Sequence, residues 1–217
     1  MASFPVRDKK ELQAILAKVD QINPLVSMML EFEARSGLRN CDVRALKFSD
    51  VMINGIIKDS FDVVQQKSLR MRMNRPKNPM SEKAAKQASK ITIHVNGEMK
   101  ELIQQIYDHN GKHALMFQSN HHLAKSGSAI SIRYVNTVLK RVAADLKLPY
   151  QLSTHSMRKT FAMMMLDGGA SMKHLKEALG HSSIAVTDHY IRTFDDETKQ
   201  FTTGISIPAI GEIEDDE

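Results

Sequence analysis

The chain has 217 residues, 42% of them hydrophobic and 25% charged, which supplies enough apolar material for one large core or two small ones. This composition argues against a disordered or fibrous protein. No apolar run approaches the roughly 20 residues that span a bilayer, and residues 1–10 lack a signal-peptide segment. The single cysteine, Cys41, excludes an internal disulfide and a Cys-rich zinc module. We therefore expect a cytoplasmic protein without membrane association.

The charge is unevenly distributed along the chain. Thirty Lys and Arg against 25 Asp and Glu give a net charge of +5. Because five of those acids lie in residues 205–217, which hold no Lys or Arg, the rest of the chain carries +10. A body this basic is typical of proteins that bind a polyanion such as nucleic acid, although other soluble proteins are basic too.

Helical periodicity opens the chain. Residues 12–19 carry apolar side chains at i, i+3, i+4 and i+7, which predicts an amphipathic helix that ends before Pro24. A second, more apolar helix is expected over residues 25–34 and ends at Gly37, and a short one over 42–46.

A small β-element follows. Apolar residues at 51, 53, 56 and 57 flank Asn54-Gly55, a hairpin turn signal. Phe61–Val64 and the alternating segment Ile91–Val95 then complete a predicted three-stranded antiparallel sheet. Between them, residues 68–90 hold seven bases, one acid and two prolines, which we interpret as an exposed, mobile insertion. This insertion is either a solvated loop or a flap that lies on phosphates.

The second half of the chain is again helical. Gly168-Gly169 and Gly180 separate the predicted helices, which cover residues 98–108, 130–146, 155–166, 172–179 and 184–191. The sequence therefore predicts a mainly α fold with one small β-element (α+β).

The most informative motifs lie in this half. His155 and Arg158 are three residues apart, so on a helix they share a face and can address one ligand. The guanidinium fork of an arginine matches two phosphate oxygens, and an imidazole can move a proton near neutral pH. His-x-x-Arg alone is weak evidence, but Leu179-Gly180-His181 and Tyr190 follow it.

The whole constellation resembles the tyrosine recombinase (phage integrase) family. In that family the catalytic region carries Gly-Leu-Arg, a hairpin Lys, His-x-x-Arg, Leu-Gly-His and, nine residues after that His, a Tyr. Gly37-Leu38-Arg39 supplies the first element here, and Tyr190 lies nine residues after His181. The resemblance runs from about Leu25 to about Thr193 and implies the tyrosine recombinase catalytic-domain fold.

The resemblance implies roles for the phosphate-binding residues and the nucleophile. Arg39 and Arg158 would bracket the scissile phosphodiester and stabilise its pentacovalent transition state. Tyr190 would attack phosphorus, form a 3′-phosphotyrosyl link and release a 5′-hydroxyl, without metal, ATP or cofactor.

The resemblance also implies roles for the residues around them. His155 would transfer a proton at the tyrosine, His181 would hydrogen-bond a nonbridging oxygen, and Asp42 would support this network. Lys67, after the second predicted strand, is our choice for the general acid that protonates the leaving group. Lys90, just before the third strand, is the alternative, because the basic insertion departs from the family's tight turn.

Double-stranded DNA is the expected partner. The implied assembly is a monomer without DNA and a homotetramer on it, with DNA-bending proteins as possible accessory factors. Candidates for contact with the DNA backbone are basic residues of the insertion and of the predicted helix over residues 130–146, namely Arg70, Arg72, Arg75, Lys77, Arg133, Lys140 and Arg141.

The expected domain organisation is a catalytic domain over residues 1–193, followed by a tail over 194–217. The tail either packs on a neighbouring subunit through its isoleucines or is frayed. The helical core-binding domain of full-length relatives is absent from this sequence, which is typical of a fragment or of a small single-domain member.

Three functions compete. The leading hypothesis is a site-specific DNA recombinase or integrase of a bacterium, phage or mobile element. A type IB topoisomerase or a telomere resolvase would share the chemistry, and a catalytically silent DNA-binding accessory protein would not need Tyr190 in register.

Overall fold

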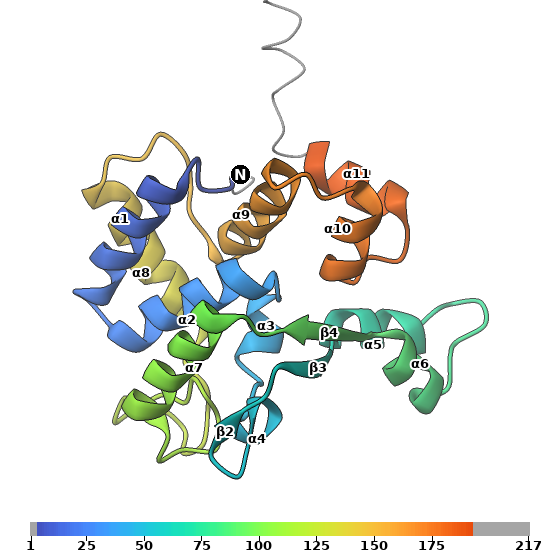
Figure 1. Ribbon diagram of the computed structural model, residues 1–217, viewed down its shortest axis with the longest axis horizontal. Helices are drawn as coiled ribbons and strands as arrows, with labels where there is room; N and C mark the ends of the chain where they lie inside the picture. The colour runs from blue at the N-terminus through green and yellow to red at the C-terminus, as the bar shows by residue number, and fades with distance from the viewer. Residues whose placement is uncertain (1–3, 193–217) are drawn as a thin grey trace, which may run out of the picture.

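The structure is a computed structural model that describes residues 4–192, and two long helices begin it (Figure 1). α1 (Lys9–Asp20) starts at Asp8, whose side chain accepts a hydrogen bond from the Glu11 amide. α2 (Pro24–Ser36) ends at Gly37, which adopts the left-handed conformation with φ 64°. A Cβ at Gly37 would stand 2.3 Å from the ring of Phe161, so this position requires glycine.

α2 lies at the centre of the helical assembly and packs against α1, α7 and α9. The predicted helices over 12–19, 25–34, 42–46, 98–108, 130–146, 155–166, 172–179 and 184–191 are all found near their expected positions. The helices after α2 are α3 (Asn40–Val43), α4 (Phe48–Val51), α5 (Gln66–Met73), α6 (Glu82–Ala88), α7 (Gly97–Asn110), α8 (Ile132–Asp145), α9 (Thr154–Asp167), α10 (Met172–Leu179) and α11 (Ile184–Arg192). The mainly helical class is therefore confirmed.

The β-structure differs from the prediction. Instead of one three-stranded sheet, the strands form two separate antiparallel pairs. The pairs are β1 (Met52–Ile53) with β2 (Ile56–Ile57), and β3 (Ser60–Val64) with β4 (Lys90–His94). Asn54 and Gly55 both have positive φ, as expected of the hairpin turn. β1 and β2 are only two residues each, and the Lys58 amide extends their register with a 2.9 Å hydrogen bond to the Val51 carbonyl.

The basic insertion is also different from the prediction, because two short helices lie where we expected a mobile loop over residues 68–90. α5 and α6 pack against each other, and Pro76 and Pro79 lie in the connection between them. α6 begins at Ser81, whose Oγ accepts from the Ala84 amide, and Ala85 is fully buried. The expected exposure is correct for most of the segment, whose arginines and lysines are mainly solvent-accessible.

Apolar side chains form one large core and one small cluster. The large core joins α1, α2, α7, α8 and the start of α9. The small cluster holds Ala162, Leu175, Leu179 and Ile191, and Tyr190 packs against it. α10 and α11 are therefore attached to the molecule through a cluster of their own.

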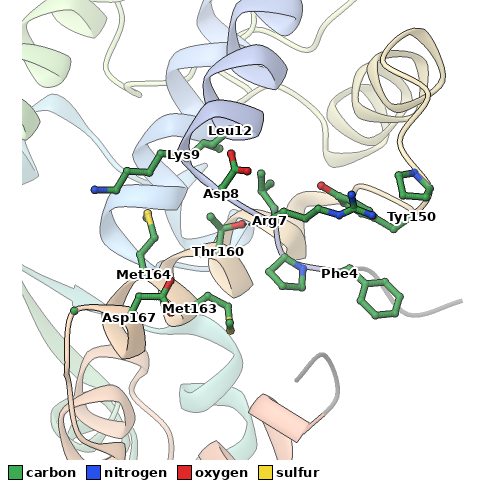
Figure 2. A pocket seen from close by; sticks show the side chains of 14 residues that line it. Phe4, Arg7, Asp8, Lys9, Leu12, Tyr150, Thr160, Met163, Met164 and Asp167 are labelled. Carbon is green, nitrogen blue, oxygen red and sulfur yellow. Dashed lines mark hydrogen bonds between the residues drawn. The ribbon is translucent and has the colours of Figure 1, made fainter. Parts of the chain in front are cut away.

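The N-terminal segment crosses the outer face of α9 (Figure 2). The Val6 amide donates a hydrogen bond of 2.9 Å to Oγ1 of Thr160, a residue of α9. A cavity of about 690 Å³ lies between this segment and α9, with Met163 and Met164 among its lining residues. Within residues 4–192 no helix is long and apolar enough to cross a bilayer. The predicted tail, 194–217, lies outside the described residues.

Candidate active site

Arg158, together with Asp42, is one of two deeply buried charged residues of the predicted site. It lies in the first turns of α9, where a serine cap at Ser153 starts the helix, and only 2% of its surface is exposed. Its guanidinium donates hydrogen bonds to the backbone carbonyl oxygens of Gly37 and Leu179, the latter at 2.6 Å. Burial first, and then the charge of Arg39, lower the pKa of Arg158 to about 9. Neutral pH lies below this pKa, so the guanidinium keeps its positive charge, and the two carbonyls that accept from it do not neutralise that charge.

Arg39 lies at the N-terminus of α3, directly after the Gly37 turn. Its Nη1 donates a 2.8 Å hydrogen bond to Oε1 of Gln65. Gln65 is fully buried, and its Nε2 donates to the Leu179 carbonyl at 3.0 Å. The Gln65 amide thus connects Arg39 to the carbonyl oxygen that also holds Arg158.

Sequence reasoning missed Gln65, although a signal was present. The alternation of Phe61 and Val63 on the buried face of β3 places residue 65 on that same face. We assigned importance to Lys67, two residues further on, and did not follow the period of the strand to its end.

His181 and Tyr190 meet at the end of α10 and in α11. Their rings form an edge contact with centroids 5.3 Å apart. Nε2 of His181 lies 3.4 Å from Nη2 of Arg158, and Nδ1 lies 3.1 Å from Oγ1 of Thr187. Both contacts are satisfied by the neutral tautomer that carries its proton on Nδ1.

Burial changes the protonation behaviour of both rings. Desolvation, followed by the charges of Arg158 and Arg39, lowers the pKa of His181 to about 4. Desolvation raises the pKa of Tyr190 to about 12, and the same two arginines act against this rise. At neutral pH the imidazole is therefore neutral and the phenol is protonated.

His155 is an exposed residue in the first turn of α9. The surrounding protein lowers the pKa of His155, first by partial desolvation and then through the charges of Arg158 and Lys67. Lys67 lies in the first turn of α5, is exposed, and lines the same cavity as His155. At neutral pH this imidazole can accept a proton.

Lys90, the alternative lysine, lies elsewhere. It is the first residue of β4, and its Nζ forms an ion pair of 2.8 Å with Asp62 on β3. Lys90 lines a neighbouring cavity that also includes Arg72 and His181. The two lysines therefore differ in surroundings: Lys67 faces the arginines and His155, and Lys90 faces a carboxylate.

Asp42 is buried in α3 and supports the start of α5, the helix that carries Lys67. Its Oδ1 accepts a hydrogen bond of 2.9 Å from the backbone amide of Gln66. Burial raises the pKa of Asp42, whereas this hydrogen bond and the charges of Arg39 and Arg158 act in the opposite direction. The carboxyl group thus links α3 to the start of α5.

These groups surround a cavity of about 830 Å³ between α5, α9, α10 and α11. Its lining includes Arg39, Lys67, His155, Arg158, His181 and Tyr190. His189, for which we had assigned no role, also lines it. In the described part of the chain, no three His, Cys, Asp or Glu side chains gather as a metal site.

The predicted DNA-backbone residues divide into two groups. Arg70, Arg72 and Arg75 line the cavity from the α5 side, and Lys77 is exposed just beyond them. Arg133, Lys140 and Arg141 are exposed on α8, which Figure 1 shows across the molecule from α5. Arg141 also lies 3.9 Å from Asp145.

The arrangement has a definite chemical capacity. Two guanidinium groups held by neutral oxygens form a positive, partly desolvated site that fits a phosphodiester. A phenol, a neutral imidazole and an ammonium group border the same cavity, so a nucleophile, a base and an acid are available together.

Comparisons with known proteins identify relatives of the chain. Residues 6–197 match the model of the phage integrase family. The chain is 27% identical over 109 residues to the tyrosine recombinase XerC of Oceanobacillus iheyensis, an alignment that covers 48% of this chain and 36% of that protein. The curated relatives matched first are covered over only 19% to 36% of their own length.

Solved structures share the fold. The integrase of transposon Tn1549, in complex with circular intermediate DNA, superposes with a TM-score of 0.65 at 17% identity, covering 94% of this chain and 67% of that one. The catalytic domain of bacteriophage HP1 integrase gives a TM-score of 0.53 at 18% identity and covers 93% and 95% of the two chains. Since the family match spans most of the chain and the fold agrees, this chain belongs to the phage integrase family.

Proposed function

We propose that this chain is the catalytic domain of a site-specific recombinase that cuts and rejoins DNA strands through a 3′-phosphotyrosyl intermediate. The observation that carries the proposal is the shared cavity, which brings Tyr190 together with two phosphate-binding arginines and with His155 and Lys67. Double-stranded DNA is the proposed partner. The related Tn1549 integrase is described in complex with DNA, and the basic α5 borders the cavity here.

The proposed cleavage step accounts for every bond and proton without metal or ATP. The phenolic oxygen of Tyr190 attacks phosphorus while its proton passes to His155. The bond from phosphorus to the 5′-oxygen breaks, and Lys67 donates a proton to that oxygen. The strand end is then held as a phosphotyrosine, and the other end is a free 5′-hydroxyl. Reversal with another 5′-hydroxyl rejoins the strand and restores both protons.

The arginines act on the charge that develops at phosphorus. The pentacovalent transition state carries more negative charge on its nonbridging oxygens than the ground state, so Arg39 and Arg158 bind it more tightly. A bound phosphate also offsets the positive charge that lowers the pKa of His181. His181 can then carry a proton on Nε2 and donate it to a nonbridging oxygen. Lys67 is preferred over Lys90 because Lys90 is paired with Asp62.

The chemistry also supports an assembly. Joining two duplexes by exchange requires all four strands to be cut, and each cavity holds one tyrosine, so four copies would act together. We propose a monomer in the absence of DNA and a tetramer on paired sites, acting in the cytoplasm, with DNA-bending proteins as accessory partners. Mass photometry with and without DNA tests this assembly, which a single stoichiometry in both conditions would contradict.

Covalent trapping tests the proposed reaction. The protein is incubated with nicked suicide duplexes, from which the short cleaved strand diffuses away, and denaturing gels detect protein joined to DNA. We expect an adduct with the wild-type chain and none with Tyr190→Phe, which should still bind DNA. An adduct that persists in Tyr190→Phe would assign the nucleophile elsewhere. Incubation with two intact duplexes that both carry the site then separates strand exchange, which yields recombinant duplexes, from resealing within one duplex, which is what a topoisomerase would perform.

A further inference from the structure

Gln65 occupies a central place between the phosphate-binding groups, although it lines no part of the cavity. It lies between β3 and α5, with none of its surface exposed. Its backbone is fixed on both sides: its amide donates to the Ser89 carbonyl at 2.9 Å, and its carbonyl accepts from the Leu69 amide at 2.9 Å. The side chain therefore projects from a rigid position.

The two ends of the Gln65 amide have different partners. Oε1 accepts from Nη1 of Arg39 at 2.8 Å, and Nε2 donates to the Leu179 carbonyl at 3.0 Å. The same carbonyl accepts from Nη2 of Arg158 at 2.6 Å. One neutral amide and one carbonyl thus connect the two guanidinium groups that would hold the phosphate.

Close packing adds to these hydrogen bonds. Gly180 has φ +62°, and a Cβ there would stand 2.6 Å from Oε1 and 2.8 Å from Cδ of Gln65. The amide therefore lies directly against the backbone of the Leu179–Gly180 turn. His181 is the next residue after this turn, so Gln65 packs against the backbone that leads into the imidazole-bearing residue.

The neutral character of the amide matters for the chemistry. A carboxylate at this position would accept equally well from Arg39 but would offset the positive charge that a phosphate needs. It would also place a second acceptor against the Leu179 carbonyl, which has no proton to donate. A glutamine satisfies both partners and leaves both guanidinium charges available.

We propose that Gln65 is a positioning residue for strand cleavage, whose amide aligns Arg39, Arg158 and the Leu179–Gly180–His181 turn around the scissile phosphate. This inference rests on the proposed recombinase function. Gln65 does not touch the substrate and acts through the two arginines.

Single-turnover cleavage of a suicide duplex, measured at saturating protein, tests the inference. We expect Gln65→Met, which keeps the length but removes both polar atoms, to slow cleavage by about 10- to 100-fold. Duplex affinity, measured separately, should change by less than about threefold, because the exposed basic residues that contact DNA are unaltered. Gln105→Met, the same substitution at an exposed position of α7, is the matched control and should cleave at the wild-type rate.

The pH dependence of cleavage by Gln65→Glu distinguishes a positioning role from a purely structural one. A protonated carboxyl has a carbonyl for Arg39 and a hydroxyl for Leu179, so it reproduces both hydrogen bonds, whereas the ionised form does not. Because His155 becomes protonated in both proteins, we expect the ratio of the variant's cleavage rate to the wild-type rate to rise as the pH is lowered through the pKa of the introduced carboxyl. The wild-type rate should fall over the same interval as His155 becomes protonated.

An unchanged cleavage rate in Gln65→Met would overturn the inference. So would a loss that merely follows the fraction of unfolded protein in a thermal melt. If the wild-type chain forms no adduct at all, the proposed function fails, and NMR of the arginine guanidinium groups without DNA decides the role of Gln65. Dispersed Arg39 signals that merge in Gln65→Met, because the group then rotates freely, would support the alignment. Identical spectra would refute it.

Discussion

Two arginines with neutral hydrogen-bond partners, the buried Arg158 and the half-buried Arg39, dominate the site at the scale of single residues. Removing a cation from water costs free energy, and carbonyl dipoles offset only part of that cost. Arg158 therefore carries an unneutralised charge next to Arg39, and an anion bound between them would relieve their mutual repulsion. This electrostatic arrangement is the physical reason to assign a phosphate to the cavity.

A pH dependence of cleavage follows from His155, the residue that would accept the proton of the nucleophile. The pKa of His155 is lowered from its ordinary 6.5, so the neutral, proton-accepting form persists as the pH falls through that value. We expect the cleavage rate at subsaturating protein, which reports the free protein, to decline only below pH 6.5. His155→Gln should be slower and lack this acid limb. A limb centred above pH 6.5 would contradict the assignment.

A second residue-scale prediction concerns stability. Glu33 is fully buried in α2, accepts a hydrogen bond from Nδ2 of Asn40, and its pKa is raised well above the ordinary value by desolvation. The neutral acid favours the folded state below pH 4.5, and this contribution is lost as the pH rises toward the raised pKa. The free energy of unfolding should therefore fall by up to about 1.4 kcal/mol per pH unit in that interval.

Glu33→Gln should remove this dependence, because an amide cannot ionise and can still pair with Asn40. Urea unfolding between pH 4 and pH 8 measures the difference between the two proteins, with Glu101→Gln, an exposed residue of α7, as the control. Parallel pH profiles for wild type and Glu33→Gln would show that the carboxyl is ionised in the folded protein.

At the scale of elements, periodicity identified the long helices and missed what depends on tertiary packing. α8 carries a strong apolar pattern, and α2 and α9 carry apolar residues between clear caps, so the positions of these helices could be predicted. α5 has no buried residue, and α6 only Ala85, so no apolar stripe marked either helix within the basic segment. The predicted three-stranded sheet is wrong because two-residue strands carry too few side chains to define a pairing partner.

The residues of the candidate site also divide into those that the sequence pattern identifies and those that depend on tertiary packing. His155, Arg158, His181 and Tyr190 could be selected from the sequence because their spacing forms a recognisable order. The alternation of β3 places Gln65 on the buried face, but its role could not be predicted, because that role comes from contacts with Arg39 and Leu179, which lie 26 and 114 positions away. Only the fold brings these segments together.

α5 supplies a prediction for DNA binding. Arg70 and Arg75 line the cavity, where they would contact phosphates beside the scissile one. Replacing either by Gln should reduce the slope of log affinity against log salt concentration by about 1, and do so similarly for different duplex sequences. Fluorescence anisotropy at several salt concentrations measures this slope, with the exposed Lys112→Gln as control and Arg133→Gln as the test of the α8 face. An unchanged slope in Arg70→Gln and Arg75→Gln would remove α5 from the interface.

At the scale of the whole molecule, the residues of the site are carried by elements that differ in how many of their side chains are buried. Arg39 and Arg158 lie beside the large core, whereas Tyr190 packs on the small cluster between α9, α10 and α11. Of the residues of α11, Thr187 and Ile191 are buried, compared with nine residues of α2. The nucleophile is thus carried by one of the less anchored helices around the cavity.

This difference predicts a gradient of local stability. We expect the amides of α11 to exchange with solvent at least about tenfold faster than those of α2, since few buried contacts oppose local opening. Hydrogen exchange with mass spectrometry measures both segments in one experiment. Equal protection of α2 and α11 would show that the small cluster holds the nucleophile as firmly as the main core holds the arginines.

The measurement that tests the central claim most directly is identification of the covalent bond itself. A trapped adduct is digested with protease and nuclease, and tandem mass spectrometry locates the residue and the strand end that are joined. The account predicts Tyr190 linked to a 3′-phosphate, with a free 5′-hydroxyl on the released strand. A link through another residue, or to a 5′-phosphate, would contradict it.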